Sequence, residues 1–292
     1  MASDGLMPAL AVLTEASATD NSSTIQGFNL HLRNHSNQDY IPKVGSHLSS
    51  EELGSMILRV EVGSGNEPGG TTTFRIHYKL LCDKIPMFKE SFGDSFEQIA
   101  EPDCQIIPDV VLVNDDPSAF RLLAGWLYMD TIDGDFDKSA SSSGKLSPKG
   151  SFRGLIMSMR LPIYIKLCIL AELYEITRLE NEAINFLIKF MIDTKTRPNP
   201  SCWLEVYKQT NSRSALRVLF CRIAVWQLSQ NGSDDAGTMD LESILCRNEE
   251  LRRDIESLKD SNEGDGPADP FLAPDCDYHN HGPVFKCPCP RR

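Results

Sequence analysis

No lysine or arginine precedes Arg33 in this chain. The apolar run LMPALAVL near the start therefore has no basic flank of the kind that a secretory signal carries, and the arginines of a transit peptide are also missing. Nor does any stretch approach the roughly 20 apolar residues that a membrane-spanning helix needs. From these absences we expect a cytoplasmic or nuclear protein without a membrane partner.

Basic residues are also few relative to acidic ones. The chain has 29 Lys and Arg against 41 Asp and Glu, which gives a formal net charge of −12 at pH 7. The affinity of proteins for nucleic acid comes largely from Lys and Arg side chains that neutralise phosphates. We therefore do not expect a nucleic-acid partner.

A complete dinucleotide-binding fingerprint is missing, although residues 60–70 (VEVGSGNEPGG) begin like one. That fingerprint has three glycines and opens a helix, whose N-terminus holds the pyrophosphate. Here Pro68 stands in the place of the third glycine, and β-branched sequence follows in residues 71–78. The pattern predicts a hairpin, with strands at residues 56–62 and 71–78 joined by a polar loop, rather than a phosphate site.

Recognisable catalytic arrangements are missing from the sequence as well. No serine or cysteine elbow and no paired acids stand near His77, so we expect a structural, hydrogen-bonded histidine there instead of a general base. Cys82 follows an apolar run, and burial raises the pKa of a thiol, which disfavours a nucleophilic thiolate. We predict that the protein is not an enzyme and has no catalytic residue and no cofactor, apart from the zinc considered below.

The chain contains a central folded region with polar ends. Residues 1–54 are rich in Ser, Asn, Thr and Asp and predict a disordered arm. Residues 55–195 carry first strand and then helix periodicity, which predicts an α/β domain of the α+β kind with a flexible insertion at about 130–151. Residues 196–230 predict a helical extension, and residues 231–239 an acidic linker.

Two helix starts are marked inside the predicted domain. Asp116 followed by Pro117 predicts an N-cap and a first helical residue. Thr177 with Glu180 makes a T-x-x-E pattern, which predicts a capping box for a second helix.

Residues 240–260 form an amphipathic strip with two possible uses. Heptad positions a and d are filled by Leu241, Ile244, Asn248, Leu251, Ile255 and Leu258. A seam with a single polar Asn is typical of a coiled-coil dimer, but this one covers fewer than the roughly three to four heptads that identify one. A self-associating coiled coil and a helix packed on its own domain both stay open.

Residues 261–292 contain a cluster of soft metal ligands. The candidates for a structural zinc site are Cys276, His279, His281 and Cys287, with Cys289 as an alternative ligand. The C-x-x-H spacing suits zinc, whereas the H-x-H and C-x-C spacings are tighter than those of common structural sites. An extended tail that packs on the domain or stays disordered is the alternative.

Four segments of this chain, in the same order, are similar to the BTB/POZ domain in the divergent form common in fungal proteins. They read FRIHYKLL, FRLLAGWLY, LAELYEITRLENEA and VYKQTNSRSALRVLF. The resemblance runs from about Leu58 to Met191, with a helical extension to about Gln230.

The resemblance implies an α/β fold with a small sheet beside a helical cluster, used as a protein-interaction module without catalytic residues. Members of the family self-associate, bind transcriptional co-repressors or hold substrates for cullin-RING ubiquitin ligases. The expected partners are therefore proteins, either a second copy of the chain or a cullin. The leading hypothesis is a scaffold, with a cullin substrate receptor as its specific version. A transcriptional co-regulator acting through partners and a small metal-dependent enzyme using the Cys/His cluster are the alternatives.

Overall fold

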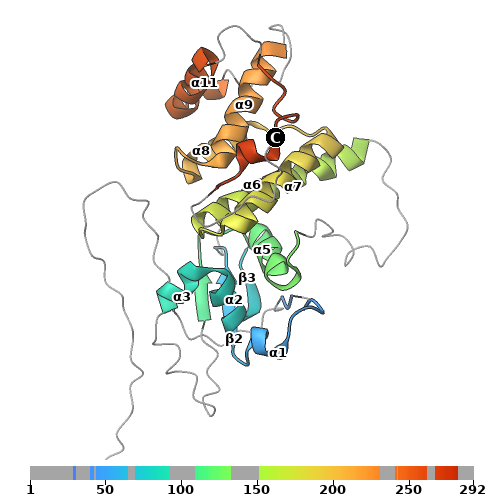
Figure 1. Ribbon diagram of the computed structural model, residues 1–292, viewed down its shortest axis with the longest axis vertical. Coiled ribbons are helices and arrows are strands. Elements are labelled where there is room, and N and C mark those ends of the chain that lie inside the picture. The colour runs from blue at the N-terminus through green and yellow to red at the C-terminus, as the bar shows by residue number, and fades with distance from the viewer. Residues whose placement is uncertain are drawn as a thin grey trace, which may run out of the picture.

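A four-stranded mixed sheet lies beside a cluster of helices in the computed structural model (Figure 1). The residues that the structure describes are 29–30, 40–42, 44–64, 70–92, 109–132, 151–230, 241, 243–261 and 267–281. The mixed α+β class predicted from the sequence is confirmed. Over these residues, no helix has both the length and the apolar character to cross a membrane.

The sheet has the strand order β1-β4-β2-β3. Strands β2 (Ile57–Val62) and β3 (Thr72–His77) are antiparallel, with Ile57 opposite His77 and Val62 opposite Thr72. Strand β4 (Asp109–Leu112) runs parallel to β2 on its other side, and β1 (Asn29–Leu30) pairs antiparallel with β4. The predicted hairpin is therefore confirmed.

Glycines mark both ends of the loop that joins β2 to β3. Gly63 has φ +95°, and a Cβ there would lie 2.6 Å from the carbonyl oxygen of Gly70 and 2.8 Å from Pro117 Cγ. Only glycine fits such a close approach in the left-handed region. Gly63 therefore serves the turn, and β3 follows where a dinucleotide loop would need a helix.

Two short helices and a longer one follow the sheet strands. Helices α2 (Tyr78–Lys84) and α3 (Pro86–Phe92) come directly after β3, and α5 (Pro117–Met129) comes after β4. As predicted, Asp116 caps α5: its Oδ1 accepts from the backbone N–H groups of Ser118 (2.9 Å) and Ala119 (3.0 Å). Its other oxygen accepts from Lys166 Nζ (2.9 Å), which ties the start of α5 to α6.

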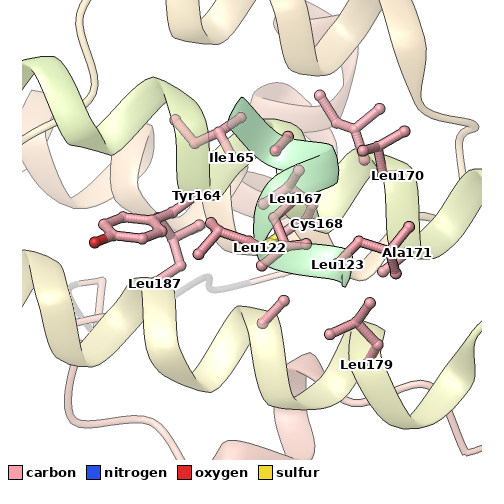
Figure 2. Packing of buried hydrophobic residues seen from close by; sticks show 14 of the residues in the cluster. Leu122, Leu123, Tyr164, Ile165, Leu167, Cys168, Leu170, Ala171, Leu179 and Leu187 are labelled. Atoms are coloured by element: carbon pink, nitrogen blue, oxygen red, sulfur yellow. The ribbon is translucent and has the colours of Figure 1, made fainter. Parts of the chain in front are cut away.

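The long helices α6 (Ser151–Leu173) and α7 (Thr177–Thr194) form an antiparallel pair that packs on α5. Figure 2 shows Leu122 and Leu123 of α5 among the apolar side chains of α6 and α7. The labelled neighbours are Tyr164, Ile165, Leu167, Cys168, Leu170, Ala171, Leu179 and Leu187. All of these side chains are buried, so the three helices share one core.

The turn between α6 and α7 differs from the capping box predicted there. Ile176 holds the N-cap position and Thr177 is the first residue inside α7. Glu175 takes a left-handed φ of 55°, and the Ile176 N–H donates to the carbonyl oxygen of Ala171 (2.9 Å). The prediction is wrong because these backbone contacts close the turn, while Glu180 binds a residue from the other end of the chain, as described below.

Part of the arm predicted to be mostly disordered as far as residue 54 belongs to the described structure, at residues 29–30, 40–42 and 44–54. Tyr40 adds a bridge to the outer edge of β3: its N–H donates to Thr73 O (2.8 Å), and its carbonyl oxygen accepts from Arg75 N (3.0 Å). The unpaired edge of β3 supplies these bonds, which composition alone cannot show. Residues 1–28, 31–39 and 43 lie outside the described part.

A short helix completes this ordered part of the arm. Helix α1 (Ser50–Leu53) begins with a full capping box, in which Ser49 and Glu52 each bind the other's backbone N–H. This helix lies against α2. The insertion predicted at about 130–151 and the linker at 231–239 fall almost wholly outside the described residues.

Helices α8 (Pro200–Gln209), α9 (Ala215–Gln230) and α11 (Glu249–Ser261) form the predicted helical extension and the strip that follows it. The heptad side chains Leu241, Ile244, Leu251 and Ile255 are buried within the chain itself, and α11 packs on α9. Asn248 is not a seam residue: its Oδ1 accepts from Leu251 N (3.0 Å) and so caps the start of α11. The packed amphipathic helix is therefore the alternative that the structure supports.

This packing gives a prediction for Leu251, which is fully buried, and for Leu258, which is only partly buried. We expect Leu251→Ala to lower the free energy of unfolding by about 2–5 kcal/mol and Leu258→Ala to cost less. Urea unfolding at two protein concentrations measures both. A cost that shrinks as the protein is diluted would instead place Leu251 in an interface between copies of the chain.

Candidate interaction site at the C-terminal segment

The segment 267–281, here called the C-terminal segment, lies across helices α7 and α9 (Figure 1). It contains the short 3-10 helix η1 (Asp275–Tyr278), drawn in red, which contacts both α7 and α9. The segment carries three of the residues predicted as zinc ligands, Cys276, His279 and His281. Its contacts define the candidate site.

Tyr278 is the central anchor of the C-terminal segment. Its side chain is only 1% exposed, and its hydroxyl donates to the carbonyl oxygen of Pro270 (2.8 Å). The guanidinium of Arg222, on α9, lies 5.2 Å from the centre of the tyrosine ring and also pairs with Asp277 (2.7 Å). Burial raises the pKa of Tyr278, so the phenol stays neutral.

Asn181 of α7 clamps the main chain of the segment at Asn280. The N–H of Asn280 donates to Asn181 Oδ1 (2.7 Å), and Asn181 Nδ2 donates to the carbonyl oxygen of Asn280 (3.1 Å). A primary amide can serve a peptide N–H and C=O together because it carries both a donor and an acceptor. Asn181 is buried, so these two bonds satisfy polar groups that would otherwise be costly.

Two further side chains of α7 bind the same part of the segment. Glu180 Oε2 accepts from the Asn280 side chain (3.1 Å), and Asn185 Oδ1 accepts from His279 Nε2 (2.8 Å). Burial raises the pKa of Glu180, whereas the bond from Asn280 lowers it, and the net shift is upward. One helix face thus holds the segment through an acid and two amides.

Phe271 provides a second anchor at the start of the segment. The guanidinium of Arg197 lies 4.5 Å from the centre of the Phe271 ring and 6.0 Å from that of Trp226. The two rings meet edge to face, with centroids 6.3 Å apart. Aromatic and cation–π contacts of this kind add to the area buried by the rings.

Helix α9, which contributes Arg222 to the site, is held by a buried arginine that sequence reasoning did not identify. Arg217 of α9 donates to Glu250 Oε2 of α11 (2.5 Å), to the carbonyl oxygen of Tyr207 (2.8 Å) and to Thr210 Oγ1 (3.0 Å). It thereby joins α8, α9 and α11. The only sequence signal was an arginine within the otherwise apolar run ALRVLFC, and its partners lie 7 to 33 positions away.

The predicted zinc ligands are near one another, and one ring nitrogen of each histidine already has a hydrogen-bond partner. His279 Nε2 donates to Asn185 Oδ1, and His281 Nε2 donates to the carbonyl oxygen of Cys276 (3.2 Å). Among the described residues, no three His, Cys, Asp or Glu side chains are grouped so that they could hold a metal ion. Cys287 and Cys289 lie outside those residues, so the zinc site stays a prediction.

His77 and Cys82, the two residues weighed as catalytic candidates, lie at the β3–α2 junction far along the chain from this segment. Tyr128 OH accepts from His77 N (2.9 Å) and lies 2.8 Å from His77 Nδ1. Burial lowers the pKa of His77, which favours the neutral ring, and raises the pKa of the Cys82 thiol to about 11. His77 therefore links the end of β3 to Tyr128 of α5, and Cys82 is buried in α2.

Comparison of this chain with protein-family models, with curated proteins and with solved structures finds no match in any of the three.

The first prediction from this site concerns Glu180. Burial raises its pKa in the folded chain above the ordinary 4.5, so the folded chain keeps this proton to a higher pH than the unfolded chain does. Stability present below pH 4.5 is then lost as the pH rises through the folded-state pKa. We expect Glu180→Gln, which keeps an acceptor for Asn280, to remove this loss and gain stability relative to the wild type between about pH 4.5 and 7.

Urea unfolding at several pH values measures the difference between the two proteins. Burial also raises the pKa of Asp115 to about 6, which adds a loss of the same sign, but that loss occurs in both proteins and cancels in the difference. A difference that does not change with pH would contradict the prediction.

The second prediction is the zinc site inferred from the sequence. We expect about one zinc ion per purified chain, bound with the roughly four ligands of a structural site, and a loss of that zinc in Cys276→Ser and Cys287→Ser. Cys246→Ser, which alters an exposed cysteine outside the cluster, is the matched control. The zinc content of the wild type and of the three variants is measured by mass spectrometry. Equal zinc in all four proteins would refute this ligand set.

Proposed function

We propose that this chain is a non-enzymatic protein-interaction scaffold of the BTB/POZ type, which acts in the cytoplasm or the nucleus by presenting folded docking surfaces to other proteins. The observation that carries the proposal is the C-terminal segment itself. Helices α7 and α9 hold this stretch of chain through Asn181 bonds to main-chain atoms and a buried tyrosine. Proteins bind peptides by combining main-chain hydrogen bonds with side-chain pockets in this way.

The positions of the segments that are similar to the BTB/POZ domain support that part of the proposal. FRIHYKLL crosses the β3–α2 junction, FRLLAGWLY forms most of α5, and LAELYEITRLENEA spans the α6–α7 turn. These segments meet in the core: Phe74 packs edge to face on Phe120 with centroids 4.9 Å apart, and His77 binds Tyr128. A small sheet beside a helical cluster is also what the resemblance implies.

A cullin is the partner that the specific version of this proposal names, with the chain as the substrate receptor of a ubiquitin ligase. The resemblance is the support for this version, and a fold-level likeness is an associational argument. Exposed apolar side chains on the helices give places to test it. They include Met129, Met159, Leu173, Ile192 and Leu204.

The test uses the full chain with point substitutions rather than a truncated one. Leu241, Ile244, Leu251 and Tyr278 are buried against the rest of the molecule, so removal of everything after α9 would uncover apolar surface and create false partners. Met159→Glu and Ile192→Glu each place a charge on an exposed apolar position, and Lys208→Glu, at an exposed polar position, is the matched control.

We expect affinity purification of the tagged chain from its native cell to recover a partner in stoichiometric amount, identified by mass spectrometry. One of the apolar-to-Glu variants should reduce that partner at least tenfold, while Lys208→Glu retains it. A cullin among the partners supports the ligase version. Recovery of the chain alone, as a monomer, would rule out the scaffold proposal.

A further inference from the structure

We propose that the surface formed by α7 and α9 under the C-terminal segment is a peptide-binding site, which the chain's own segment occupies and which takes an acidic-aromatic peptide from another protein when that segment leaves. The inference deepens the proposed function by naming one docking surface and the chemistry of its ligand. It rests on the contacts of this surface and needs no resemblance to any family.

The polar character of the α7 face is the first argument. Glu180 and Asn181 are 5% and 4% exposed with the segment in place. Buried helix positions are ordinarily apolar, because a buried polar group without a partner is costly. Their partners on the segment are the side chain and the main chain of Asn280. Departure of the segment would therefore leave both groups to water, which solvates an acid and an amide well. The face is therefore suited to an open as well as an occupied state.

The form of recognition is the second argument. Asn181 binds the N–H and C=O of one residue, and every peptide except one with proline at that position presents the same two groups. The clamp therefore sets the conformation of the ligand and leaves its sequence largely open. Sequence selection falls to the side chains on either side of the clamp.

Those side-chain contacts define the ligand. Arg222 pairs with Asp277 and covers the ring of Tyr278, so an acid followed by an aromatic residue fits there. Arg197 covers Phe271 in the same manner at the other end. Two arginines along this surface, in a chain with a net charge of −12, favour an acidic and aromatic peptide with its clamped residue two positions after the tyrosine.

Covalent attachment explains why the chain's own segment, and not an outside peptide, occupies the site. The segment follows α11 after a short connection from Ser261 to Pro267, and a short tether gives an effective concentration on the order of millimolar. An outside peptide competes poorly against such a ligand. Weakening of the segment should therefore expose the site to a peptide added in solution.

The experiment uses the full chain and, as its probe, a fluorescein-labelled synthetic peptide with the sequence of residues 267–281. Two variants weaken the segment in different ways. Tyr278→Ala removes the buried anchor, and Asp277→Ala with Asn280→Ala removes exposed side chains, which leaves no cavity in the fold. Circular dichroism and urea unfolding select the variants that keep the fold.

We expect fluorescence anisotropy to show at least tenfold tighter binding of the probe to either variant than to the wild type. Addition of Asn181→Ala or Arg222→Gln to the variant should reverse this gain at least tenfold. Arg252→Gln, on the exposed face of α11, is the matched control and should leave binding unchanged. A probe with alanine in place of its tyrosine should bind at least tenfold more weakly.

Equal and negligible binding of the probe to the wild type and to the folded variants would overturn the inference, and the segment would then be a fixed part of the core. A dimer of the wild-type chain that the free probe disperses would overturn the choice of occupant, because the site would then serve a second copy. The partners recovered by affinity purification do not enter this measurement, so the scaffold proposal and this inference fail separately.

Discussion

The packing of α5 between the sheet and the α6–α7 pair is the constraint on which the rest of this structure depends. Phe120 meets Phe74 of β3 on one side, and Leu122 and Leu123 enter the core of α6 and α7 on the other (Figure 2). A helix that is buried on both sides must begin at a fixed residue, because a shift of one residue along the helix rotates each side chain by about 100° around the helix axis. Asp116 supplies that start, since it caps α5 and binds Lys166 of α6 together. The position of α7, and of everything bound to it, follows.

Sequence patterns predicted the elements whose causes are local. The β2–β3 hairpin and the Asp116 cap depend on residues within a few positions of one another, and both were predicted. The heptad strip was visible in the sequence too, but its pattern could not show which surface its apolar side chains contact. The packing of α11 on α9 shows that they are buried within the chain itself. Thr177 and Glu180 were assigned to a local capping box that a partner 100 residues away displaces.

The candidate site was only half visible from the sequence. Cys276, His279 and His281 stood out because their residue types suggest a metal. The residues that hold this part of the segment are Asn185, which binds His279, and Asn181, which binds Asn280; they lie 94 and 99 positions earlier than their partners and look like ordinary polar residues of a helix. Arg217 was missed for the same reason, since its role depends on carbonyl groups that only the fold brings to it. Short-range sequence patterns cannot predict contacts between residues so far apart in the chain. The spacing of apolar residues in an amphipathic helix, in contrast, predicts which face of that helix is buried.

Two kinds of buried polar residue hold the C-terminal half together, and they behave differently when their partners leave. Arg217 binds the backbone carbonyls of Tyr207 in α8 and of Thr210 at its end, so it keeps its partners whatever happens to the C-terminal segment. Glu180 and Asn181 instead form hydrogen bonds with Asn280 of the segment itself. Loss of one partner from a buried arginine leaves a charge in the core, whereas loss of the segment returns an acid and an amide to water. Arg217 therefore stabilises the helical extension independently of the C-terminal segment, whereas the polar contacts on α7 depend on that segment and on the buried ring of Tyr278.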